Sequence, residues 1–439
     1  MLERYEAYKD SGVEWIGEVP EHWGVSKFAF AGTTSLGKML TPNPETEDDQ
    51  LLPYLCAANV KESGIVLEQL KEMYFSPKDG DKYMLMCSDL VVVEGGNVGL
   101  SHVWTGGEMR IQNALHRFRA NEQYVAEYLK YSLDVAKNAG YIDLVCNKAT
   151  IAHFTSEKLM ETPVCCIPLC EQRAIADYLD EKTAEIDSIV SETERSIELL
   201  REYRKSVISE AVTKGLDPDV PTKDSGVEWI GDIPETWETT KVKYLAACLN
   251  GDRGVNYPSG DDMVEEGVAF VTTDSIHGTC IDFDRVKRIT EERYGLLGGV
   301  KLRIGDIVYC LRGSVGVCAI NSAENSGTVA SSLMVIRSFG CDSKWLLYVL
   351  ESEVVSLQVS ELTNGTCAAN LSAENVTRFD LPFPSVEEQH AIRDYFDTKT
   401  SEIDALIADK ERQVELLKEY RKSLISEAVT GKFKVPGVK

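Results

Sequence analysis

The segment RIQNALHRFR, residues 110–119, carries side chains of the types that read DNA bases. It has three arginines, one histidine and no acidic residue, together with Gln112 and Asn113. Arginine can bond guanine through two hydrogen bonds in the major groove, and asparagine or glutamine can bond adenine in the same way. The candidate DNA contacts in this segment are Arg110, Gln112, Asn113, His116 and Arg117.

A second candidate lies just upstream, in the stretch EGGNVG. Gly96 and Asn97 suggest a tight turn whose backbone could approach a ligand closely, because glycine has no Cβ. Both segments have simpler explanations. Residues 110–119 alternate like a solvated strand and turn, and most Gly-rich turns of this kind only connect two strands.

An equivalent position lies 217 residues further along the chain, where DIVYCLRGSVG from Asp306 matches DLVVVEGGNVG from Asp89. Here Arg312 and Ser314 stand where the first copy has Gly95 and Asn97, and GTVASSLMVIRS is nearly uncharged where the first copy is basic. The polar loop TNGTCAANLS adds the candidates Asn364, Thr366 and Asn370. Different side chains at equivalent positions predict two different half-sequences, and so an asymmetric target.

Sequence motifs for catalysis are absent. The chain has no GxxxxGK motif followed by Ser or Thr, which excludes the usual ATP-driven translocase. It also lacks an Asn or Asp followed by two prolines and an aromatic residue, which adenine methyltransferases use to hold a flipped base. Cys165, Cys166 and Cys170 lack CxxC spacing, and the six histidines show no metal-ligand spacing. We therefore expect a non-catalytic chain without a metal, with reduced thiols.

The overall charge limits the partners. With 46 basic and 71 acidic residues the formal net charge is -25, which argues against nonspecific adhesion to nucleic acid or to an anionic membrane. Any contact with DNA must therefore be local. No apolar run approaches the ~18 residues of a membrane span, and the start, MLERYEAYKD, lacks the apolar core of a signal peptide. We expect a cytoplasmic protein.

Internal repetition provides the elements that would position these residues. The phrase DSGVEWIGEVPEHW at 10–23 returns as DSGVEWIGDIPETW at 224–237. The stretch from Glu171 to Thr213 returns from Glu388, with the identical pentapeptide EYRKS in both copies. The order is phrase, variable region, helix, repeated twice. Joining the C-terminal tail to the N-terminal segment would recreate the connection between helix and phrase, which indicates a circular layout.

Apolar residues at steps of three and four predict a long helix in each copy. The expected stripes are Ile186, Ile189, Val190, Ile197, Leu200, Tyr203, Val207 and Ala211, and Ile403, Leu406, Ile407, Val414, Leu417, Tyr420, Leu424 and Ala428. Each helix could lie on its own domain. Two matched helices of roughly 60 Å can instead bury their stripes on each other as a coiled coil. A pseudo-twofold would make this coiled coil antiparallel, with polar Thr193 and Lys410 at one position of the stripes.

The chain resembles the specificity subunit of a type I restriction-modification enzyme. The resemblance rests on the two phrases, on the helix starts EQRAIADYLDEKTAEID and EQHAIRDYFDTKTSEID, and on the ending LISEAVTGK. It covers essentially the whole chain. One departure is VCCIPLCEQ before the first helix, where the second copy has the proline-rich LPFPSVEEQ.

The resemblance implies an α+β fold in which two globular α/β target recognition domains are separated by two long antiparallel helices, with a pseudo-twofold internal repeat. The implied segments are 1–168 for the N-terminal segment and first recognition domain, 169–215 for the first spacer helix, 216–385 for the linker and second recognition domain, 386–430 for the second spacer helix, and 431–439 for the tail. Each recognition domain would read one half of a split double-stranded DNA target.

The resemblance also implies partners. Two methyltransferase subunits using S-adenosylmethionine would methylate adenines, and two restriction and translocase subunits would need ATP and Mg²⁺; this chain would bind none of these cofactors. The repeated segments would hold the methyltransferases, with candidate contacts Trp15, Trp23, Trp229, Trp237, Tyr203, Arg204, Tyr420 and Arg421. For the tryptophans, packing within their own domain is the alternative.

Two other classes of protein fit part of the sequence. An acidic coiled-coil scaffold outside restriction-modification would explain the helices and the charge, but not the basic segment at 110–119. An acidic DNA mimic would explain the charge alone, and it would not need duplicated variable domains. Copurification without a methyltransferase or nuclease partner would favour either of them.

Overall fold

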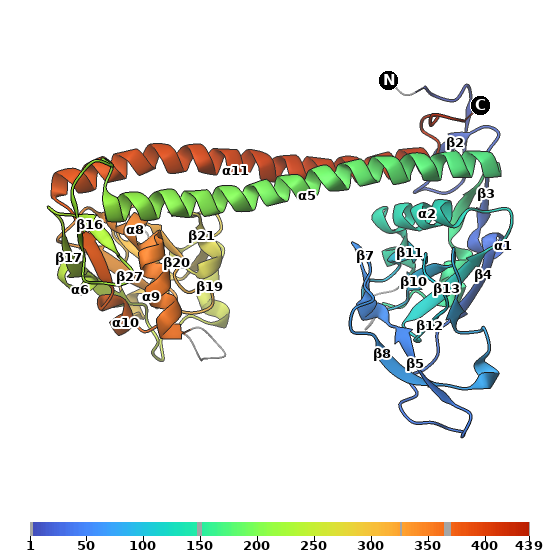
Figure 1. Ribbon diagram of the computed structural model, residues 1–439, viewed down its shortest axis with the longest axis horizontal. Coiled ribbons are helices and arrows are strands. Elements are labelled where there is room, and N and C mark those ends of the chain that lie inside the picture. The colour runs from blue at the N-terminus through green and yellow to red at the C-terminus, as the bar shows by residue number, and fades with distance from the viewer. Residues whose placement is uncertain (1–2, 147–151, 325–326, 364–369, 439) are drawn as a thin grey trace. The chain divides into compact units, whose positions relative to one another are not determined.

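The computed structural model describes residues 3–146, 152–324, 327–363 and 370–438. They divide into two compact units: unit 1 combines 1–193 with 412–439, and unit 2 comprises 194–411. Two long helices, α5 (Leu169–Lys214) and α11 (Val386–Val429), each contribute one part to unit 1 and the other part to unit 2 (Figure 1). No helix within the described ranges is long and apolar enough to cross a membrane.

Unit 1 is built mainly from short strands. The strands are β1 (Tyr8–Asp10), β2 (Glu18–Pro20), β3 (Gly24–Lys27), β4 (Gly32–Leu36), β5 (Gln50–Leu55), β6 (Val60–Lys61), β7 (Gly64–Ile65), β8 (Lys71–Phe75), β9 (Met84–Leu85), β10 (Leu90–Val93), β11 (Ser101–Val103), β12 (Met109–Ile111), β13 (Leu115–Ala120) and β14 (Pro163–Cys166). The short helices are α1 (Phe28–Ala31), η1 (Ala57–Asn59), η2 (Pro77–Asp79), α2 (Ala126–Asn138), α3 (Tyr141–Val145) and α4 (Ser156–Glu161).

Unit 2 repeats this plan with differences in the insertions. Its strands are β15 (Thr222–Asp224), β16 (Asp232–Pro234), β17 (Glu238–Lys241), β18 (Ala246–Asn250), β19 (Met263–Val264), β20 (Val268–Val271), β21 (Ile276–His277), β22 (Cys280–Ile281), β23 (Lys287–Ile289), β24 (Ile307–Cys310), β25 (Cys318–Ile320), β26 (Thr328–Val329), β27 (Leu333–Ser338) and β28 (Asp380–Phe383). Its short helices are α6 (Val242–Leu245), η3 (Gly260–Asp262), η4 (Thr273–Ser275), α7 (Glu291–Leu296), α8 (Ser343–Glu351), α9 (Glu353–Thr363) and α10 (Ala373–Thr377).

The sheets of the two units share one topology. In unit 1 the strand orders are β11-β10-β13-β4 and β8-β5-β12-β9; in unit 2 they are β25-β24-β27-β18 within a longer sheet, and β23-β20-β26. The parallel pair β5 and β12 corresponds to the parallel pair β20 and β26. Strands β10 and β24 are completely buried apolar runs, as expected of central strands covered on both faces.

The long helices bury a narrower stripe than the sequence pattern suggested. The buried positions of α5 include Ile186, Val190, Thr193 and Ile197, which follow alternating steps of four and three. That spacing defines a coiled-coil seam. Ile189 and Tyr203 fall beside it and are 44% and 58% exposed, and their counterparts in α11, Leu406 and Tyr420, are also exposed. The prediction that these four side chains lie in the buried stripe is therefore wrong.

Ion pairs give the direction of the two helices inside each unit. In unit 1, Arg421 of α11 lies 2.8 Å from Asp187 of α5. In unit 2, Arg204 of α5 lies 3.0 Å from Asp404 of α11. The repeat offset of 217 converts one pair into the other, since 187 becomes 404 and 204 becomes 421. The helix parts within each unit thus make reciprocal contacts, as antiparallel copies do.

The repeated phrase attaches each unit to a long helix. Trp23 and Trp237 are buried, and each indole nitrogen donates a hydrogen bond to a glutamate in the first turns of a helix, Glu171 at 3.0 Å and Glu388 at 2.9 Å. A buried indole N–H needs such an acceptor. These two hydrogen bonds tie the phrase to its helix in the same way in both units.

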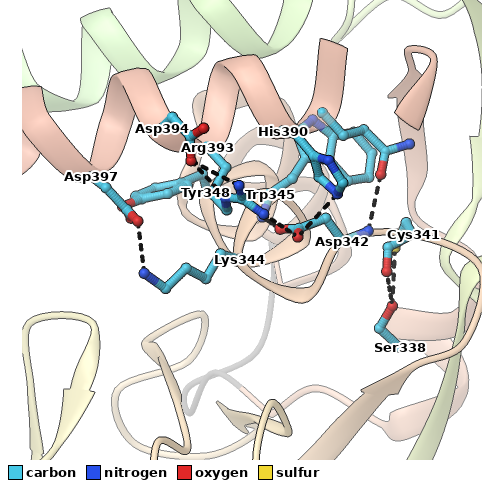
Figure 2. Close-up of polar contacts among 11 residues, drawn as sticks. Ser338, Cys341, Asp342, Lys344, Trp345, Tyr348, His390, Arg393, Asp394 and Asp397 are labelled. Atoms are coloured by element: carbon cyan, nitrogen blue, oxygen red, sulfur yellow. Dashed lines mark hydrogen bonds and ion pairs between the residues drawn. The ribbon is translucent and has the colours of Figure 1, made fainter. Parts of the chain in front are cut away.

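A second duplicated contact joins the variable region to its helix. Gln172 accepts a hydrogen bond from the backbone nitrogen of Val125 at 2.9 Å, and Gln389 accepts one from Asp342 at 3.0 Å. Figure 2 shows the surroundings of the second contact, where Lys344 and Tyr348 of α8 reach Asp397 of α11 at 2.7 Å and 2.8 Å. The variable region is therefore held to the helix by the same backbone positions in each copy.

The two ends of the chain meet within unit 1. The backbone nitrogen of Lys434 donates a hydrogen bond to the Glu3 carbonyl at 2.6 Å, and the Tyr8 hydroxyl donates one to the Lys432 carbonyl at 3.2 Å. In unit 2 the segment between α5 and β15 runs continuously through this position. The arrangement is the one that a circular layout predicts.

Candidate nucleic-acid interface

Two arginines of the basic segment hold a loop of their own domain. Arg110 donates to the Gly80 carbonyl at 2.5 Å, and Arg117 donates to the carbonyls of Asp81 and Met84 at 2.7 and 3.1 Å. Burial lowers the pKa of the Arg117 guanidinium. These side chains are engaged in supporting residues 80–84, so the structure does not present them as free base contacts.

The remaining candidates of this segment are also engaged. His116 is completely buried in β13; its Nε2 lies 2.8 Å from the Phe154 carbonyl oxygen and its Nδ1 3.3 Å from the Ser156 hydroxyl. Its selection as a DNA contact is corrected here, because it cannot reach a ligand at the surface. Gln112 donates to Asn113 at 2.6 Å, and both side chains are half-buried.

The Gly-rich turns are the exposed candidates, and they have one backbone geometry. In unit 1 the turn after β10 has positive φ at Gly96 (89°) and Gly99 (75°); in unit 2 the turn after β24 has positive φ at Gly313 (76°) and Gly316 (91°). Such φ values favour glycine over any residue with a Cβ. The closing hydrogen bonds also match: the nitrogens of Gly99 and Gly316 donate to Val93 and Cys310 at 2.9 and 3.1 Å.

A neighbouring segment lies against each turn. Gly95 forms an isolated bridge with His153, and Arg312 forms one with Asn370. His153 and Asn370 are both exposed, and they are separated by the same offset of 217 residues. We call the turn and its bridged residue the recognition edge of each unit: residues 95–97 with 153 in unit 1, and residues 312–314 with 370 in unit 2.

The side chains at the two recognition edges differ. Asn97 is exposed, and its amide oxygen accepts a hydrogen bond from the half-buried Lys137 ammonium of α2. Arg312 and Ser314 are exposed, and neither side chain has a polar partner in the described part of the chain. Two donor groups capable of contacting bases or phosphates are therefore available in unit 2.

Sequence reasoning missed one residue of the unit 1 edge, His153, and the residue that bonds to this edge, Lys137. His153 could have been found by applying the repeat offset to Asn370. Lys137 could have been found because its counterpart in the repeat is Val354, a buried apolar residue. The candidates Asn364 and Thr366 lie outside the described residues.

A bidentate ion pair fixes the strands behind each edge. Arg119 of β13 donates two hydrogen bonds of 2.7 Å to Asp89, and Arg337 of β27 donates two of 2.7 Å to Asp306. Both aspartate side chains are almost completely buried. Parallel N–H bonds of this kind restrict the geometry of both partners. They position the strands that lead into the two turns.

The candidate partner contacts also separate into buried and exposed groups. Trp23 and Trp237 are buried, so neither indole is available to another protein. Trp15 and Trp229 are half-buried, and Trp15 packs on Tyr141 with 5.7 Å between ring centroids. Arg204 and Arg421 are occupied by the ion pairs between the helices, whereas Tyr203 and Tyr420 are exposed.

Within the described residues, no group of three or more His, Cys, Asp or Glu side chains could hold a metal ion. The cysteines that the structure describes are free thiols, and burial raises the pKa of the Cys165 thiol to about 12. A thiol with so high a pKa is a weak nucleophile at neutral pH.

Known proteins with similar sequences include type I specificity subunits. Residues 234–416 match the family model of the type I restriction modification DNA specificity domain. The MjaVIII specificity subunit of a type I restriction enzyme from Methanocaldococcus jannaschii is 23% identical over 428 residues, covering 95% of this chain and 94% of that protein. The EcoBI specificity subunit from Escherichia coli is 23% identical over 354 residues, covering 76% and 73%.

A solved structure has the same fold. It comes from work on complex assembly and conformational transition of the type I R-M system, and it superposes with a TM-score of 0.69 at 15% identity over 94% of this chain and 99% of that chain. The predicted fold class, recognition domains combined with long coiled-coil helices, is confirmed. Residues 234–416 thus match a type I restriction modification DNA specificity domain, and nearly the whole chain is similar in sequence and fold to type I specificity subunits.

Proposed function

We propose that this chain reads an asymmetric, two-part DNA target, with unit 1 recognising one half and unit 2 the other. The observation that carries the proposal is the pair of recognition edges. Their turns have the same positive-φ glycines and closing hydrogen bonds, yet one presents Asn97 and His153 and the other Arg312, Ser314 and Asn370. One backbone with different side chains suits one docking geometry with two base preferences.

The two long helices set the number of base pairs between the halves. They contain 46 and 44 residues, which corresponds to about 69 and 66 Å at 1.5 Å per residue. Half-sites read from one face of B-DNA must lie about one helical turn, roughly 34 Å, apart or a multiple of it. Base pairs between the halves need no direct contact, so their sequence is free.

Chemistry belongs to partner subunits in this proposal. Two methyltransferase subunits, using S-adenosylmethionine, act on adenines of the target, and two restriction and translocase subunits use ATP and Mg²⁺. An enzyme that modifies a base must extrude it from the stack, which requires a partner beside each half-site. The acidic chain itself supplies local recognition, and the partners supply much of the positive charge that phosphate contacts need.

Exposed apolar side chains on the helices support two equivalent docking sites for the methyltransferases. Unit 1 has Ile189, Leu416 and Tyr420, and unit 2 has their repeat equivalents Leu406, Leu199 and Tyr203. All six are between 44% and 58% exposed. Apolar residues that are exposed twice at matching positions fit two copies of one partner better than random surface variation.

Mapping of methylated adenines across a genome tests the proposal. Cells with the partner methyltransferase are compared with and without this chain. We expect a split motif with two unlike halves that disappears when the chain is deleted. An unchanged methylation pattern, with the partners active, would reject the proposal, and two identical inverted halves would reject the asymmetric reading.

A purified complex provides an independent test. The chain should bind a duplex containing both halves more tightly together with the methyltransferase than alone, since the partner contributes phosphate contacts. Equal affinity of the isolated chain would contradict the division of charge between subunits. Copurification of the chain with neither partner would instead favour a scaffold outside restriction-modification.

A further inference from the structure

Unit 1 has a half-buried lysine, Lys137, at a position where the equivalent residue of unit 2 is apolar. Lys137 lies in the last turn of α2, at a position where the repeat has Val354, which is 2% exposed. An apolar side chain therefore suits this site in the shared framework. Replacing it by a half-buried lysine removes the ammonium group partly from water, which is unfavourable unless a partner compensates.

The compensating partner is at the recognition edge. The Lys137 Nζ donates a hydrogen bond to the Asn97 amide oxygen. Burial lowers the pKa of the Lys137 ammonium, whereas the nearby carboxylates of Glu62, Asp134 and Asp143 favour its charged form. Because these three carboxylates favour the charged form, Lys137 donates as an ammonium group. A charged donor forms a stronger hydrogen bond with an amide oxygen than a neutral donor does.

This contact determines which way the Asn97 amide is oriented. An ammonium group has donors only, so the atom that faces it must be the amide oxygen and not the nitrogen. Asn97 is exposed, and the Cβ position of the adjacent Gly96 has no neighbour within 4 Å. In the part of the chain that the structure describes, the Asn97 amide nitrogen has no hydrogen-bond partner, and the turn around it is open.

We propose that Lys137 is a positioning residue for base recognition in unit 1: it holds Asn97 as a hydrogen-bond donor, so the base that Asn97 reads carries an acceptor. In the major groove, guanine, thymine and adenine all have such an acceptor, whereas cytosine has only the N4 donor. The inference rests on the proposed function, because it assumes that the recognition edge contacts DNA.

Unit 2 has a different arrangement at the equivalent place. Val354 cannot donate a hydrogen bond, and the residue corresponding to Asn97 is Ser314, whose hydroxyl can both donate and accept. Among the described residues of unit 2, none forms a hydrogen bond with the Ser314 side chain as Lys137 does with that of Asn97. The positioning is specific to one half of the target, which makes unit 2 an internal control.

The test uses the full chain with its methyltransferase partner in cells, and reads out the methylated motif. N97A should relax the preference at one position of one half by about fivefold or more. K137M should relax the same position, and K137R should retain the preference because it preserves a charged donor. S314A serves as the matched control and should leave that half unchanged.

Outcomes separate the inference from the proposed function. If wild type gives a split motif and N97A relaxes one position but K137M does not, Lys137 has no positioning role. If N97A leaves both halves intact, the turn does not read bases, although the proposed function stands. Absence of any split motif in wild type would reject both.

K137M could act by unfolding unit 1 rather than through Asn97. Thermal unfolding of each purified variant checks this, and the change in motif gives a second distinction. A folding defect would reduce methylation at every site in proportion, whereas a positioning defect alters the preference at a single base. A uniform loss in K137M, with N97A selective, would overturn the inference.

Discussion

Ser88 shows at the residue scale how one copy of the framework can deviate from the other. It has φ of 72°, and its counterpart 217 residues later is Gly305, with φ of 80°. A residue with a Cβ is strained in this region, whereas glycine is not. We predict that S88G stabilises unit 1 by about 0.5–1 kcal/mol in chemical denaturation.

The reciprocal substitution provides the control. G305S should destabilise unit 2 by a similar amount, since the open surroundings of Gly305 leave backbone strain as the main effect; the nearest side-chain atom to its Cβ position, the Ser343 hydroxyl, is 3.6 Å away. If S88G were destabilising, the higher entropy that glycine gives the unfolded chain would outweigh the relief of backbone strain, and the interpretation would be incorrect.

His116 makes the stability of unit 1 depend on pH. Burial lowers the pKa of His116 below its ordinary value of 6.5, so the unfolded chain takes up a proton first as the pH falls. The contribution that the neutral, buried His116 makes to the free energy of unfolding is therefore fully present above about pH 6.5 and is lost progressively below it. We predict a smaller slope of unfolding free energy against pH, between 7.5 and 5.5, for H116Q than for wild type.

Two features make that measurement interpretable. His102 also has its pKa lowered by burial, so H116Q should reduce the slope without abolishing it. H277Q changes an exposed histidine of unit 2 and should leave the slope unchanged. Equal slopes for wild type and H116Q would mean that His116 does not control the pH dependence.

At the residue scale the sequence predicted two tight turns that the structure contains, but not the surroundings of the candidate side chains. The glycines at 96 and 313 are visible as a pattern, because tight turns need them. The burial of His116 and the loop contacts of Arg110 and Arg117 depend on residues 30 to 40 positions away in the chain. Composition alone cannot distinguish an arginine that supports a loop from one that contacts DNA.

At the scale of elements, the long helices could be predicted and their exact contact face could not. Uninterrupted apolar periodicity indicated both helices. Ile189 and Tyr203 fit a broad amphipathic stripe as well as their neighbours do, but a coiled coil buries only the strict four-three alternation. The polar Thr193 does lie in the seam, where its hydroxyl donates to the Ile189 carbonyl at 2.7 Å.

Arg204 and Arg421 are equivalent in the repeat and differ in their surroundings, which gives a prediction for this scale. Arg204 pairs with Glu351 at 3.3 Å as well as with Asp404. Glu351 is mostly buried, and burial raises its pKa. Removing Arg204 leaves that carboxyl without a cation, and we expect R204M to destabilise the protein by about 2–3 kcal/mol.

R421M is the matched variant. Arg421 pairs with Asp187, whose side chain is 56% exposed, so its loss should change the unfolding free energy by less than about 1 kcal/mol. Urea denaturation of both variants at pH 7 checks the difference. Equal effects would show that Glu351 does not distinguish the two positions.

At the scale of the whole molecule, the proposal that the helices set the spacing predicts that longer helices give a target with more base pairs between its two halves. Twenty-one residues inserted into both helices keep the coiled-coil register, because they make three heptads, and lengthen each helix by about 32 Å, close to one turn of B-DNA. At about 3.4 Å per base pair, we predict a methylation motif with the same two halves and about nine more base pairs between them.

Insertion into one helix alone is the control. It shifts one helix along the other, so that Arg204 no longer faces Asp404 or Arg421 no longer faces Asp187. We expect reduced methylation and no new defined spacing. A double insertion that retains the original spacing would contradict the proposal that the helices set the distance.

The division into two equivalent units could be predicted from the sequence, because a repeat is recognised by comparing residues and not by knowing which residues are in contact. Matching phrases and matching helices indicated two equivalent units before any geometry was known. The differences between units, such as Lys137 against Val354 or Ser88 against Gly305, gained meaning only when burial and backbone angles were added. Repetition predicts what the units share, and the structure shows what distinguishes them.

The tryptophan and glutamine contacts that attach each unit to its helix have an evolutionary consequence. Because the Trp23–Glu171 and Trp237–Glu388 bonds and their glutamine counterparts recur at both attachment points, we expect that the stretch between them can be exchanged as one segment. A gene encoding it could be transferred from one half to the other, or acquired from another strain, without compensating mutations in the rest of the chain. Under the proposed function, one such exchange would replace a whole half of the target in a single step.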